Sequence, residues 1–487
     1  MALNSSGPLS FGGSTVGQSI NLELGVSATA LASINSTAFR TLAGVASGQI
    51  SLANFYGKSN ISGWLAIYAT TIPAASNSLA NAVTADSSNN IYVMGMVANS
   101  SRLIKISSAG TLLASTNPTN LGSWTYALGE SNYRIVTDSS NNVYTVSVNS
   151  SYTIVTKFNS SLTVQDCKRY QANPVPSGSN NPSGLFVSSG GDIYYGNSGY
   201  NGAYEVLSGY ITKLDSSFNF VSALSNNRGD TGGSTSDIVL DSSGNLISLF
   251  RNNTIYKFSG AGPTVTWRNK PVDTAGGNYP QNAKLAIDSS DNLYMGYMGT
   301  TAAVYCGICK VNSSGVVQWA REVLKDTGGY INQVIVGSDG FIYAVGNIPL
   351  GDYNYWGGYI VKYNSSGTIQ WQRILYNANI GSNDYQVALT GIRYTSEGLA
   401  IAGGIKNNGN STVNFIVGLI PADGAGTGSY TISGVNVTYA ASTNTESART
   451  LNDTDPAIPI NAGGNLTSAL TPDISSPSNT ITKVSLS

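Results

Sequence analysis

Short apolar runs separated by turn-forming residues follow one another along most of the chain, and their arrangement repeats between residues 80 and 425. Each unit holds an Asp-Ser-Ser-Asn-Asn type phrase, an apolar-Tyr-apolar run, and a Lys-bearing run that ends in a Ser-Gly type phrase. Runs rich in β-branched and aromatic residues between such polar clusters are typical of β-strands. Helical spacing of apolar positions is absent from these units, so the pattern predicts an all-β region.

The spacing of the units predicts how the strands assemble. The first phrase begins the segments 84–93, 136–145, 186–195, 239–248, 286–295, 335–344 and 393–402, which follow one another about every 50 residues. The sixth unit contains four strand-like runs, VIVGS, FIYAVG, YIVKY and TIQWQRI, separated by turn residues. Seven such four-stranded units at this period predict a seven-bladed β-propeller.

A closed propeller needs every blade to be complete, because open sheet edges promote aggregation. The fourth strand of several units carries a tryptophan, namely Trp267, Trp319 and Trp371. The seventh unit has no such strand after 423–424, whereas Trp64 stands in a similar run before the first unit. We therefore expect residues 62–70 to form the outer strand of the seventh blade. The predicted domains are 1–60, 61–430 for the propeller, and a β-rich C-terminal extension over 431–487.

Two polar positions recur with the blades. The predicted equivalents of Asp86 are Asp138, Ser188, Asp241, Asp288, Gly337 and Tyr394. Calcium binding is one interpretation of these aspartates, but carboxylates spread around a ring cannot share an ion, so we favour hydrogen bonds within each tight turn. The recurring lysines are Lys105, Lys157, Lys213, Lys257, Lys310 and Lys362. We expect them to lie between blades or reach solvent with their aliphatic stems packed.

Composition narrows the possible chemistry. The 487 residues include no histidine, which excludes Ser-His-Asp and Cys-His catalysis and histidine metal sites. The net charge of −1 argues against nucleic acid or an anionic membrane as the main partner. Cys306 and Cys309 form a lone Cys-x-x-Cys pair, which we interpret as small buried residues or a local disulfide. We expect no catalytic site, no cofactor and no metal.

The loops of the repeat differ greatly in their variability. The phrases that join the first to the second strand, and the third to the fourth, hardly change, whereas the other two connections vary in length and fall on one face. Variable loops on a rigid scaffold commonly carry binding residues. The loop 351–359 is rich in aromatic residues suited to stacking on sugar rings. The candidate ligand-binding residues are Tyr353, Tyr355, Trp356, Trp124 and Tyr126.

Two segments resemble known families. The repeat, with its Asp turn, Lys-bearing strand, Ser-Gly turn and Trp strand, is similar to the bacterial β-propeller repeat called SBBP. The segment 47–58, SGQISLANFYGK, resembles an N-terminal phrase of tailed-bacteriophage tail and tail-fibre proteins, which implies a module that docks into a virion. The resemblance implies docking residues Ile50, Phe55, Tyr56 and Lys58. The alternative is a locally packed, capped helical turn.

Together these features predict a structural protein of a bacteriophage tail, in a fibre or near the baseplate, that displays its propeller for attachment to the host surface. One alternative is a tail component that binds only other virion proteins, and another is a bacterial surface adhesin. The expected partners are other tail proteins, further copies of this chain, and a host surface glycan or protein. The first residues resemble no signal peptide, and no run of about 20 apolar residues occurs, so we expect the protein in the virion and not inserted in a membrane.

Overall fold

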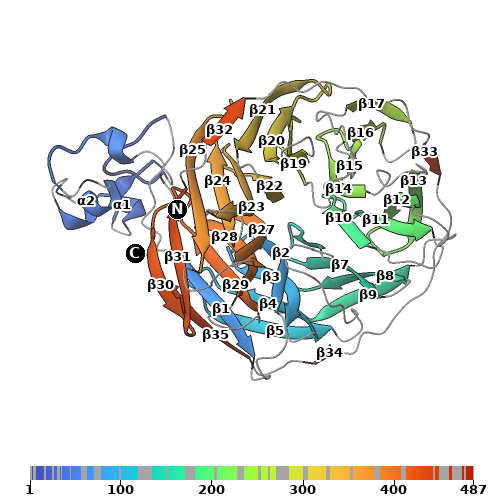
Figure 1. Cartoon of the computed structure of the whole chain (residues 1–487), viewed down its shortest axis with the longest axis horizontal. Coiled ribbons are helices and arrows are strands. Elements are labelled where there is room, and N and C mark those ends of the chain that lie inside the picture. Colours follow the sequence, from blue (N-terminus) through green and yellow to red (C-terminus); the bar gives the residue numbers. More distant parts are fainter. Residues whose placement is uncertain are drawn as a thin grey trace.

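Seven β-sheets stand around a central channel in the computed structural model of the chain (Figure 1). The structure describes residues 3, 7–15, 18–24, 27–29, 33, 36–43, 45, 47–55, 63–70, 78–97, 100–118, 134–149, 152–170, 181–201, 206–226, 235–250, 254–260, 264–269, 284–299, 305–324, 329–350, 355–377, 384–385, 387–406, 413–442, 445–448, 460–462, 474–475 and 479–485. Every sheet is built from four consecutive antiparallel strands or their equivalent, which confirms the seven-bladed β-propeller.

The blades follow the sequence order, and the first strand of each blade lies innermost. Blades 1 to 3 contain β2 (Leu79–Ala85), β3 (Ile91–Val97), β4 (Ser100–Ile106), β5 (Leu112–Pro118); β6 (Arg134–Thr137), β7 (Val143–Asn149), β8 (Tyr152–Phe158), β9 (Val164–Tyr170); and β10 (Asn181–Val187), β11 (Ile193–Asn201), β12 (Val206–Leu214), β13 (Phe220–Asn226). Blades 4 and 5 contain β14 (Thr235–Leu240), β15 (Leu246–Phe250), β16 (Ile255–Phe258), β17 (Val265–Asn269); and β18 (Leu285–Ile287), β19 (Leu293–Gly299), β20 (Tyr305–Val311), β21 (Val317–Leu324).

Blade 6 contains β22 (Tyr330–Val336), β23 (Ile342–Leu350), β24 (Tyr355–Tyr363) and β25 (Ile369–Tyr376), with the short β26 (Asp384–Tyr385) parallel to β24. Blade 7 contains β27 (Val387–Thr395), β28 (Gly398–Lys406), β29 (Val413–Ile420) and, from the other end of the chain, β1 (Trp64–Thr70). The middle strands are buried on both faces, as in β3 and β28. This explains why their sequences read as continuous apolar runs and not as alternating ones.

The seventh blade closes the ring as the sequence predicted. Strand β1 pairs antiparallel with β29, with Trp64 opposite Leu419. The Trp64 indole Nε1 donates to the Ser108 carbonyl of blade 1 at 2.7 Å, so this strand also joins the last blade to the first.

The same joint recurs between other blades. Trp319 of blade 5 donates from Nε1 to the Ser365 carbonyl of blade 6 at 3.0 Å, and Trp267 and Trp371 make the equivalent bonds. The tryptophan ring lies against a turn glycine of the next blade; a Cβ on Gly367 would come within 2.7 Å of Trp319. Blades 2 and 3 have buried Leu162 and Phe218 at that turn position instead of glycine.

At these joints, a large side chain on one blade is paired with a small residue on the next, and either side can supply the large one. The preceding blades 1 and 2 carry Ala114 and Asp166 at the position where other blades carry tryptophan, opposite the recurring lysine. A large residue from one side or the other therefore fills every joint except that between blades 3 and 4, where Ser222 stands opposite Lys213 and the turn residue is Gly260; this filling keeps the interior close-packed. The tryptophans at equivalent positions therefore have a structural role, because each packs one blade against the next.

The C-terminal extension adds an outer strand to five of the seven blades. It contains β30 (Gly428–Ile432), β31 (Val435–Ala441), β32 (Thr445–Ala448), β33 (Ile460–Ala462), β34 (Ile474–Ser475) and β35 (Asn479–Ser485). In chain order these strands pair with blades 6, 5, 3, 1 and 7, and the red elements around the rim in Figure 1 follow this path. The extension therefore pairs within the chain and ends against β1.

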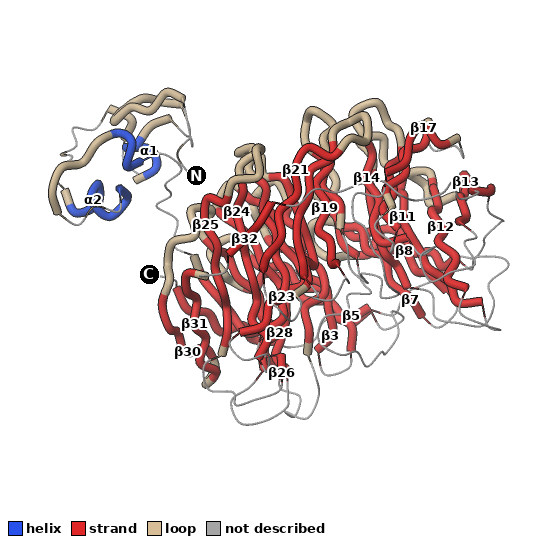
Figure 2. Tube along the Cα trace, turned by 45° about the horizontal axis from the view of Figure 1, so that its top comes forward, coloured by secondary structure: helices blue, strands red, loops and turns tan. Residues whose placement is uncertain are grey.

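The N-terminal residues form a small module with its own core. It contains α1 (Ile20–Glu23), α2 (Thr37–Ala43) and the 3-10 helix η1 (Leu52–Phe55). The buried residues of its core are Leu3, Ile20, Phe39, Leu42, Ala43 and Phe55. Figure 2 shows this module beside the propeller and outside the ring of blades. No helix among the described residues is long and apolar enough to cross a membrane.

Candidate functional site

The channel-facing position of the inner strands differs from blade to blade. The equivalent residues, four positions before the turn residue, are Ala82, Arg134, Gly184, Asp237, Lys284, Gln333 and Gly391. All of them except the two glycines line a cavity of about 280 Å³ inside the ring. Three of them are charged, and all three belong to blades 2, 4 and 5. The channel is the place where the repeat is least regular.

The charged residues of the channel are held by backbone groups of neighbouring blades. The Lys284 ammonium donates to the carbonyls of Ser183 and Ser236 at 2.9 and 3.0 Å, and the Arg134 Nε donates to the Ser183 carbonyl at 2.6 Å. Asp237 accepts from the Leu285 amide at 3.0 Å. These bonds join blades 2 to 5 at their inner edges.

Burial governs the ionisation of the two cations. Desolvation lowers the pKa of Lys284 to about 7, with the nearby charge of Arg134 acting in the same direction and Asp237 opposing both. Burial lowers the pKa of Arg134 to about 10, again opposed by Asp237. Asp237 is thus the negative charge that lets two cations stay close together in this cavity.

Uncharged residues join the other inner strands. Gln333 accepts from the Ile392 amide at 2.8 Å, and the Asn332 side chain donates to the Leu389 carbonyl at 2.7 Å. The Thr390 hydroxyl donates to the Ala80 carbonyl at 2.6 Å and so joins blade 7 to blade 1. Most polar groups of the channel interior are therefore engaged in holding the blades together, and they have a structural role.

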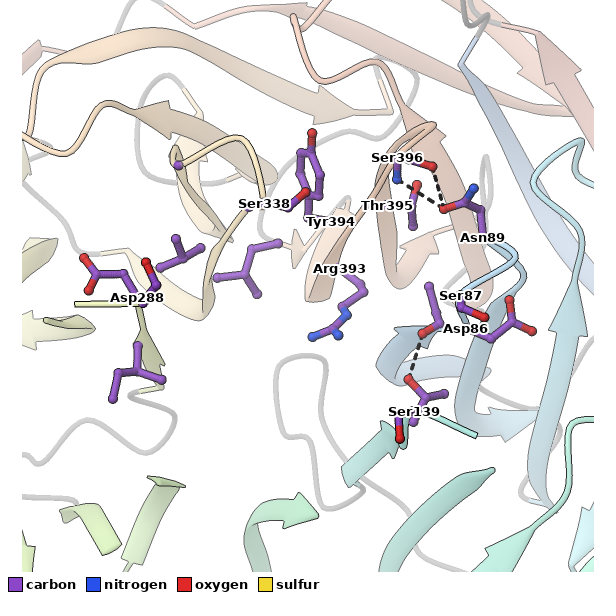
Figure 3. Close-up of a pocket in the computed structure, with 18 of the residues that line it drawn as sticks. Asp86, Ser87, Asn89, Ser139, Asp288, Ser338, Arg393, Tyr394, Thr395 and Ser396 are labelled. Carbon is purple, nitrogen blue, oxygen red and sulfur yellow. Dashed lines mark hydrogen bonds between the residues drawn. The ribbon is translucent and has the colours of Figure 1, made fainter. Parts of the chain in front are cut away.

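The channel opens into a wider mouth on the side of the turns that follow the inner strands (Figure 3). The mouth has a volume of about 920 Å³. Its polar lining comes from the turns of blades 1, 2, 5, 6 and 7 and includes Ser87, Asn89, Ser139, Asn141, Ser289, Ser338 and Ser396. This size falls within the usual range of small-ligand sites. We therefore take this mouth as the candidate functional site.

The aspartates around the mouth are committed to their own turns. Asp86 accepts from the amides of Ser88 and Asn90 at 3.0 and 2.8 Å, and its other oxygen accepts from the Tyr92 hydroxyl at 3.0 Å. Burial opposes its ionisation, but the hydrogen bonds from Asn90 and Tyr92 and the charge of Lys105 outweigh burial and lower its pKa. Asp138, Asp241 and Asp288 make the same turn bonds. The predicted turn role is confirmed.

One assignment in the repeat was wrong by a residue. In blade 7 the equivalent of Asp86 is Thr395 and not Tyr394, because Tyr394 pairs with Leu399 as Ala85 pairs with Ile91. The blade has a two-residue hairpin turn at this point, so the sequence is shorter than in the other turns. The Thr395 hydroxyl accepts from the Glu397 amide at 3.2 Å, which reproduces one of the aspartate bonds.

The recurring lysines connect blades, as expected. Lys105 lies 3.6 Å from the Asp86 carboxylate and donates to the Ser160 carbonyl of blade 2 at 2.9 Å. Its ammonium also lies over the Tyr92 ring at 5.1 Å. The turns that follow the inner strands form a belt around the ring. The lysines and aspartates of this belt of turns neutralise one another, so the belt carries little net charge.

Arg393 is the exception among the charged residues of the channel. It lies on β27 and lines both the channel interior and its mouth, with an exposed side chain. Figure 3 shows its guanidinium in the opening between the turns of blades 1 and 6. No ion pair or hydrogen bond to its side chain is formed by the residues that the structure describes. In the other blades this position holds Thr84, Val136, Phe186, Val239, Ala286 and Ile335.

The predicted ligand-binding aromatic residues lie elsewhere. Tyr355 and Trp356 were expected in a loop, but they begin strand β24, opposite Leu350 and Pro349. The half-buried Trp356 ring stacks on Tyr330 with 5.5 Å between ring centroids. Tyr353, Trp124 and Tyr126 lie outside the described residues, so their grouping with Trp356 stays a prediction.

The predicted docking residues contribute to the core of the N-terminal module. Phe55 is fully buried and packs edge-on against Phe39 at 5.9 Å, and Ile50 is partly buried against the same core. Tyr56 and Lys58 lie outside the described residues. The exposed apolar side chains of this module are instead Phe11, at 40%, and Leu52, at 39%.

The cysteines are buried and reduced. Cys167, Cys306 and Cys309 are all free thiols, so the interpretation as small buried residues holds and the local disulfide does not form. Burial raises the pKa of the Cys309 thiol to about 12, which leaves it protonated and unreactive. The described part of the chain contains no group of three or more His, Cys, Asp or Glu side chains that could hold a metal ion.

The sequence contains a signal for Arg393 that is visible only when the units are aligned on their strands. Aligning the seven units on their paired strands, and not on the aspartate phrase, places an arginine where the other units have apolar residues or threonine. The turn of the seventh unit is shorter than the others, so an alignment on the aspartate phrase is shifted by one residue and does not show this difference. The cavity itself could not be found from sequence, since it arises from the closure of the ring.

Solved structures with similar folds include proteins of different kinds. A catalytically inactive virginiamycin B lyase from Staphylococcus aureus with quinupristin has 14% identity and a TM-score of 0.47, covering 74% of this chain and 99% of that chain. The WD40 domain of Neurospora crassa Pan2 has 8% identity and a TM-score of 0.43, covering 73% and 95%. The WD40 propeller domain of Doa1 has 10% identity and a TM-score of 0.43, covering 72% and 96%.

These similarities concern the fold alone. A propeller fold by itself does not distinguish an enzyme from a binding protein. No protein-family model and no curated protein matches the sequence.

Proposed function

We propose that this chain is a structural protein of a bacteriophage tail that attaches through its N-terminal module and presents its propeller to the host surface. The observation that carries the proposal is the division of the chain into two parts with separate cores. The module core is built from residues 3–55, and none of them belongs to the clusters of the propeller. A small attached module and a large closed scaffold suit a protein that is held at one end and binds at the other.

The phrase that resembles tail proteins supports this proposal through its place in the module. Ile50 and Phe55 of that phrase help to form the module core. Such residues preserve the shape of a docking unit, whereas the exposed Phe11 and Leu52 are available to contact a neighbouring protein. Docking through the module would leave the channel mouth of the propeller open to solvent.

Attachment in this proposal is a matter of binding and not of catalysis. The chain has no histidine, and the carboxylates around the mouth are bonded within their turns. Several copies on one particle would combine weak contacts into strong attachment, because each further contact forms at a high effective concentration. The closed ring suits this role, since it holds the binding surface rigid and reduces the entropy lost on binding.

The attachment to the particle is tested by removing residues 1–60 from the chain encoded in the phage. We expect the shortened chain to be absent from purified particles, and a thermal melt of the isolated chain checks that its propeller still folds. Normal incorporation of the shortened chain would exclude the docking role. A milder variant, Leu52→Ser, should lower incorporation without unfolding the module core; Phe11 is left in place because its ring packs against Phe39 and Phe55.

The attachment to the host is tested separately with the purified full-length chain. We expect it to bind host cells and to reduce infection when it is added before the phage. Incorporation into particles without any binding to cells would favour the alternative of a tail component that contacts only other virion proteins. Presence on the bacterial surface and absence from particles would favour a bacterial adhesin.

A further inference from the structure

We propose that the mouth of the central channel binds the carboxylate of an acidic sugar through Arg393. This names a ligand class for the attachment role proposed above, and it places binding on the turn side of the ring and not on the variable loops. The site is the cavity of about 920 Å³ shown in Figure 3.

The charge of Arg393 is available to a ligand. The inner cations, Arg134 and Lys284, share Asp237 and the carbonyl of Ser183, so they are held within the wall. Arg393 is exposed in the mouth and has no acceptor or carboxylate among the described residues. A cation inside a cleft with low-dielectric walls attracts anions more strongly than one on an open surface.

The carboxylates that line the mouth do not compete for this arginine. Asp86 and Asp138 accept hydrogen bonds from their turn amides and from Tyr92 and Tyr144, respectively. Asp288 does the same with its turn and Tyr294. Figure 3 shows Asp86 and Asp288 directed away from Arg393. An incoming anion would therefore meet a guanidinium and not a fixed salt bridge.

The repeat shows that an arginine is not needed there for folding. Six blades place Thr84 or an apolar residue at the same point of the inner strand, and each of those blades is complete. Elsewhere in the channel, a charged residue that departs from the repeat has a bond to a neighbouring blade, as Asp237 does. Arg393 departs from the repeat without such a bond among the described residues.

The rest of the mouth suits a sugar. Its rim presents hydroxyl and amide groups from five blades, among them the exposed Ser139 and Ser289, which have no hydrogen-bond partner among the described residues. Sugar hydroxyls can both donate to and accept from such groups. A planar guanidinium binds a carboxylate through two parallel hydrogen bonds, which selects it over a neutral hydroxymethyl group.

The test uses three ligands that differ at one carbon: methyl β-D-glucuronide, methyl β-D-glucoside, and methyl β-D-glucoside 6-phosphate. Their binding to the full-length chain is measured by calorimetric titration at fixed ionic strength. We expect the glucuronide to bind, the neutral glucoside to bind at least tenfold more weakly, and the phosphate to bind no better than the carboxylate. Equal binding of the neutral sugar, or tenfold preference for the phosphate, would overturn the proposal.

Variants assign the binding to the residue. Arg393→Gln should weaken glucuronide binding at least tenfold, as expected for loss of a charge-assisted bond, and Arg393→Lys should retain part of it. Arg268→Gln, on the outer strand of blade 4, is the matched control and should bind as the natural chain does. Thermal melts check folding, and unchanged affinity of Arg393→Gln would refute the site.

Failure of this proposal is distinguishable from failure of the proposed function. If the natural chain and Arg393→Gln bind host cells equally, attachment stands and the mouth is not its contact, which refutes the present inference. If the natural chain binds the glucuronide but no host cell, the site stands and the attachment role fails.

Discussion

The belt of turns and the channel lining lie side by side on the inner strands, yet they are built in opposite ways. In the belt, the same carboxylate, tyrosine and lysine return in successive blades, and each carboxylate is satisfied within its own turn, as with Asp241 and Asn245. In the channel, the residue varies from blade to blade and only glycine occurs twice, and the bonds of the polar residues cross from one blade to the next, as from Lys284 to Ser236. Repeated positions stabilise the blade, whereas unrepeated ones join neighbouring blades and, in our proposal, provide the binding surface.

The largest effect is expected from titrating the buried channel. The pKa of Lys284 is lowered in the folded chain to about 7, so between this value and its unfolded value of 10.5 the unfolded chain binds more protons. Stability should therefore rise with pH in this window, on the order of 1.4 kcal/mol for each unit of the shift. Urea unfolding from pH 7 to about 8 measures the first part of the rise, because above this pH the cysteines and tyrosines of the unfolded chain begin to ionise and oppose it.

The matched variant is Lys284→Met, which fills similar space without a titrating group. It should lose most of the rise between pH 7 and about 8. If the free energy of unfolding of the variant depends on pH as it does in the natural chain, Lys284 is not the titrating group. The channel would then not differ from the belt of turns in its buried charge.

The next effect is expected from removing Asp237, the anion that acts on both channel cations. Asp237→Asn would leave Arg134 and Lys284 close together without a compensating charge, so we expect a loss of about 3–5 kcal/mol at pH 7. Denaturant unfolding measures it, and Glu397→Gln in the partly buried turn of blade 7 is the control. A loss below about 1 kcal/mol would mean that the cluster is well hydrated.

A smaller effect is expected in the belt, because the loss stays within one blade. Asp241→Ala removes the acceptor for two turn amides and for Lys257, whose ammonium lies 2.7 Å from the carboxylate. We expect a loss of about 1–3 kcal/mol and no change in sugar binding at the mouth. Altered binding would show that the belt also belongs to the site.

The smallest effect is expected in blade 3, which departs from the repeated pattern. Ser188 accepts from the Asp192 amide at 3.0 Å, and Lys213 pairs with the Asp192 carboxylate at 2.7 Å. Ser188→Asp alone would place two carboxylates together and should cost about 1 kcal/mol. Adding Asp192→Asn restores the repeated pair and should return stability to within about 0.5 kcal/mol of the natural chain. Additive losses would mean that the two positions do not interact.

The exchange of side-chain size at the joints shows why the local pattern was a better guide to fold than to function. Trp319 with Gly367, and Asp166 with Phe218, are different sequences with the same packing result. Any sequence that fills the joint preserves the blade, so apolar periodicity alone predicted the number of strands and blades. The same tolerance meant that recurring tryptophans and lysines indicated packing and gave no information about a ligand.

The sequence by itself determined the seven units, their turns, and the closing strand 62–70, because strand alternation, turn residues and period are local properties. It also indicated that Cys306 and Cys309 would be buried. Only the tertiary structure decided that the C-terminal extension pairs with outer strands around the ring, and that Arg393 stands exposed in a polar mouth. Both depend on contacts between residues far apart in the chain, and ring closure is what brings those residues together.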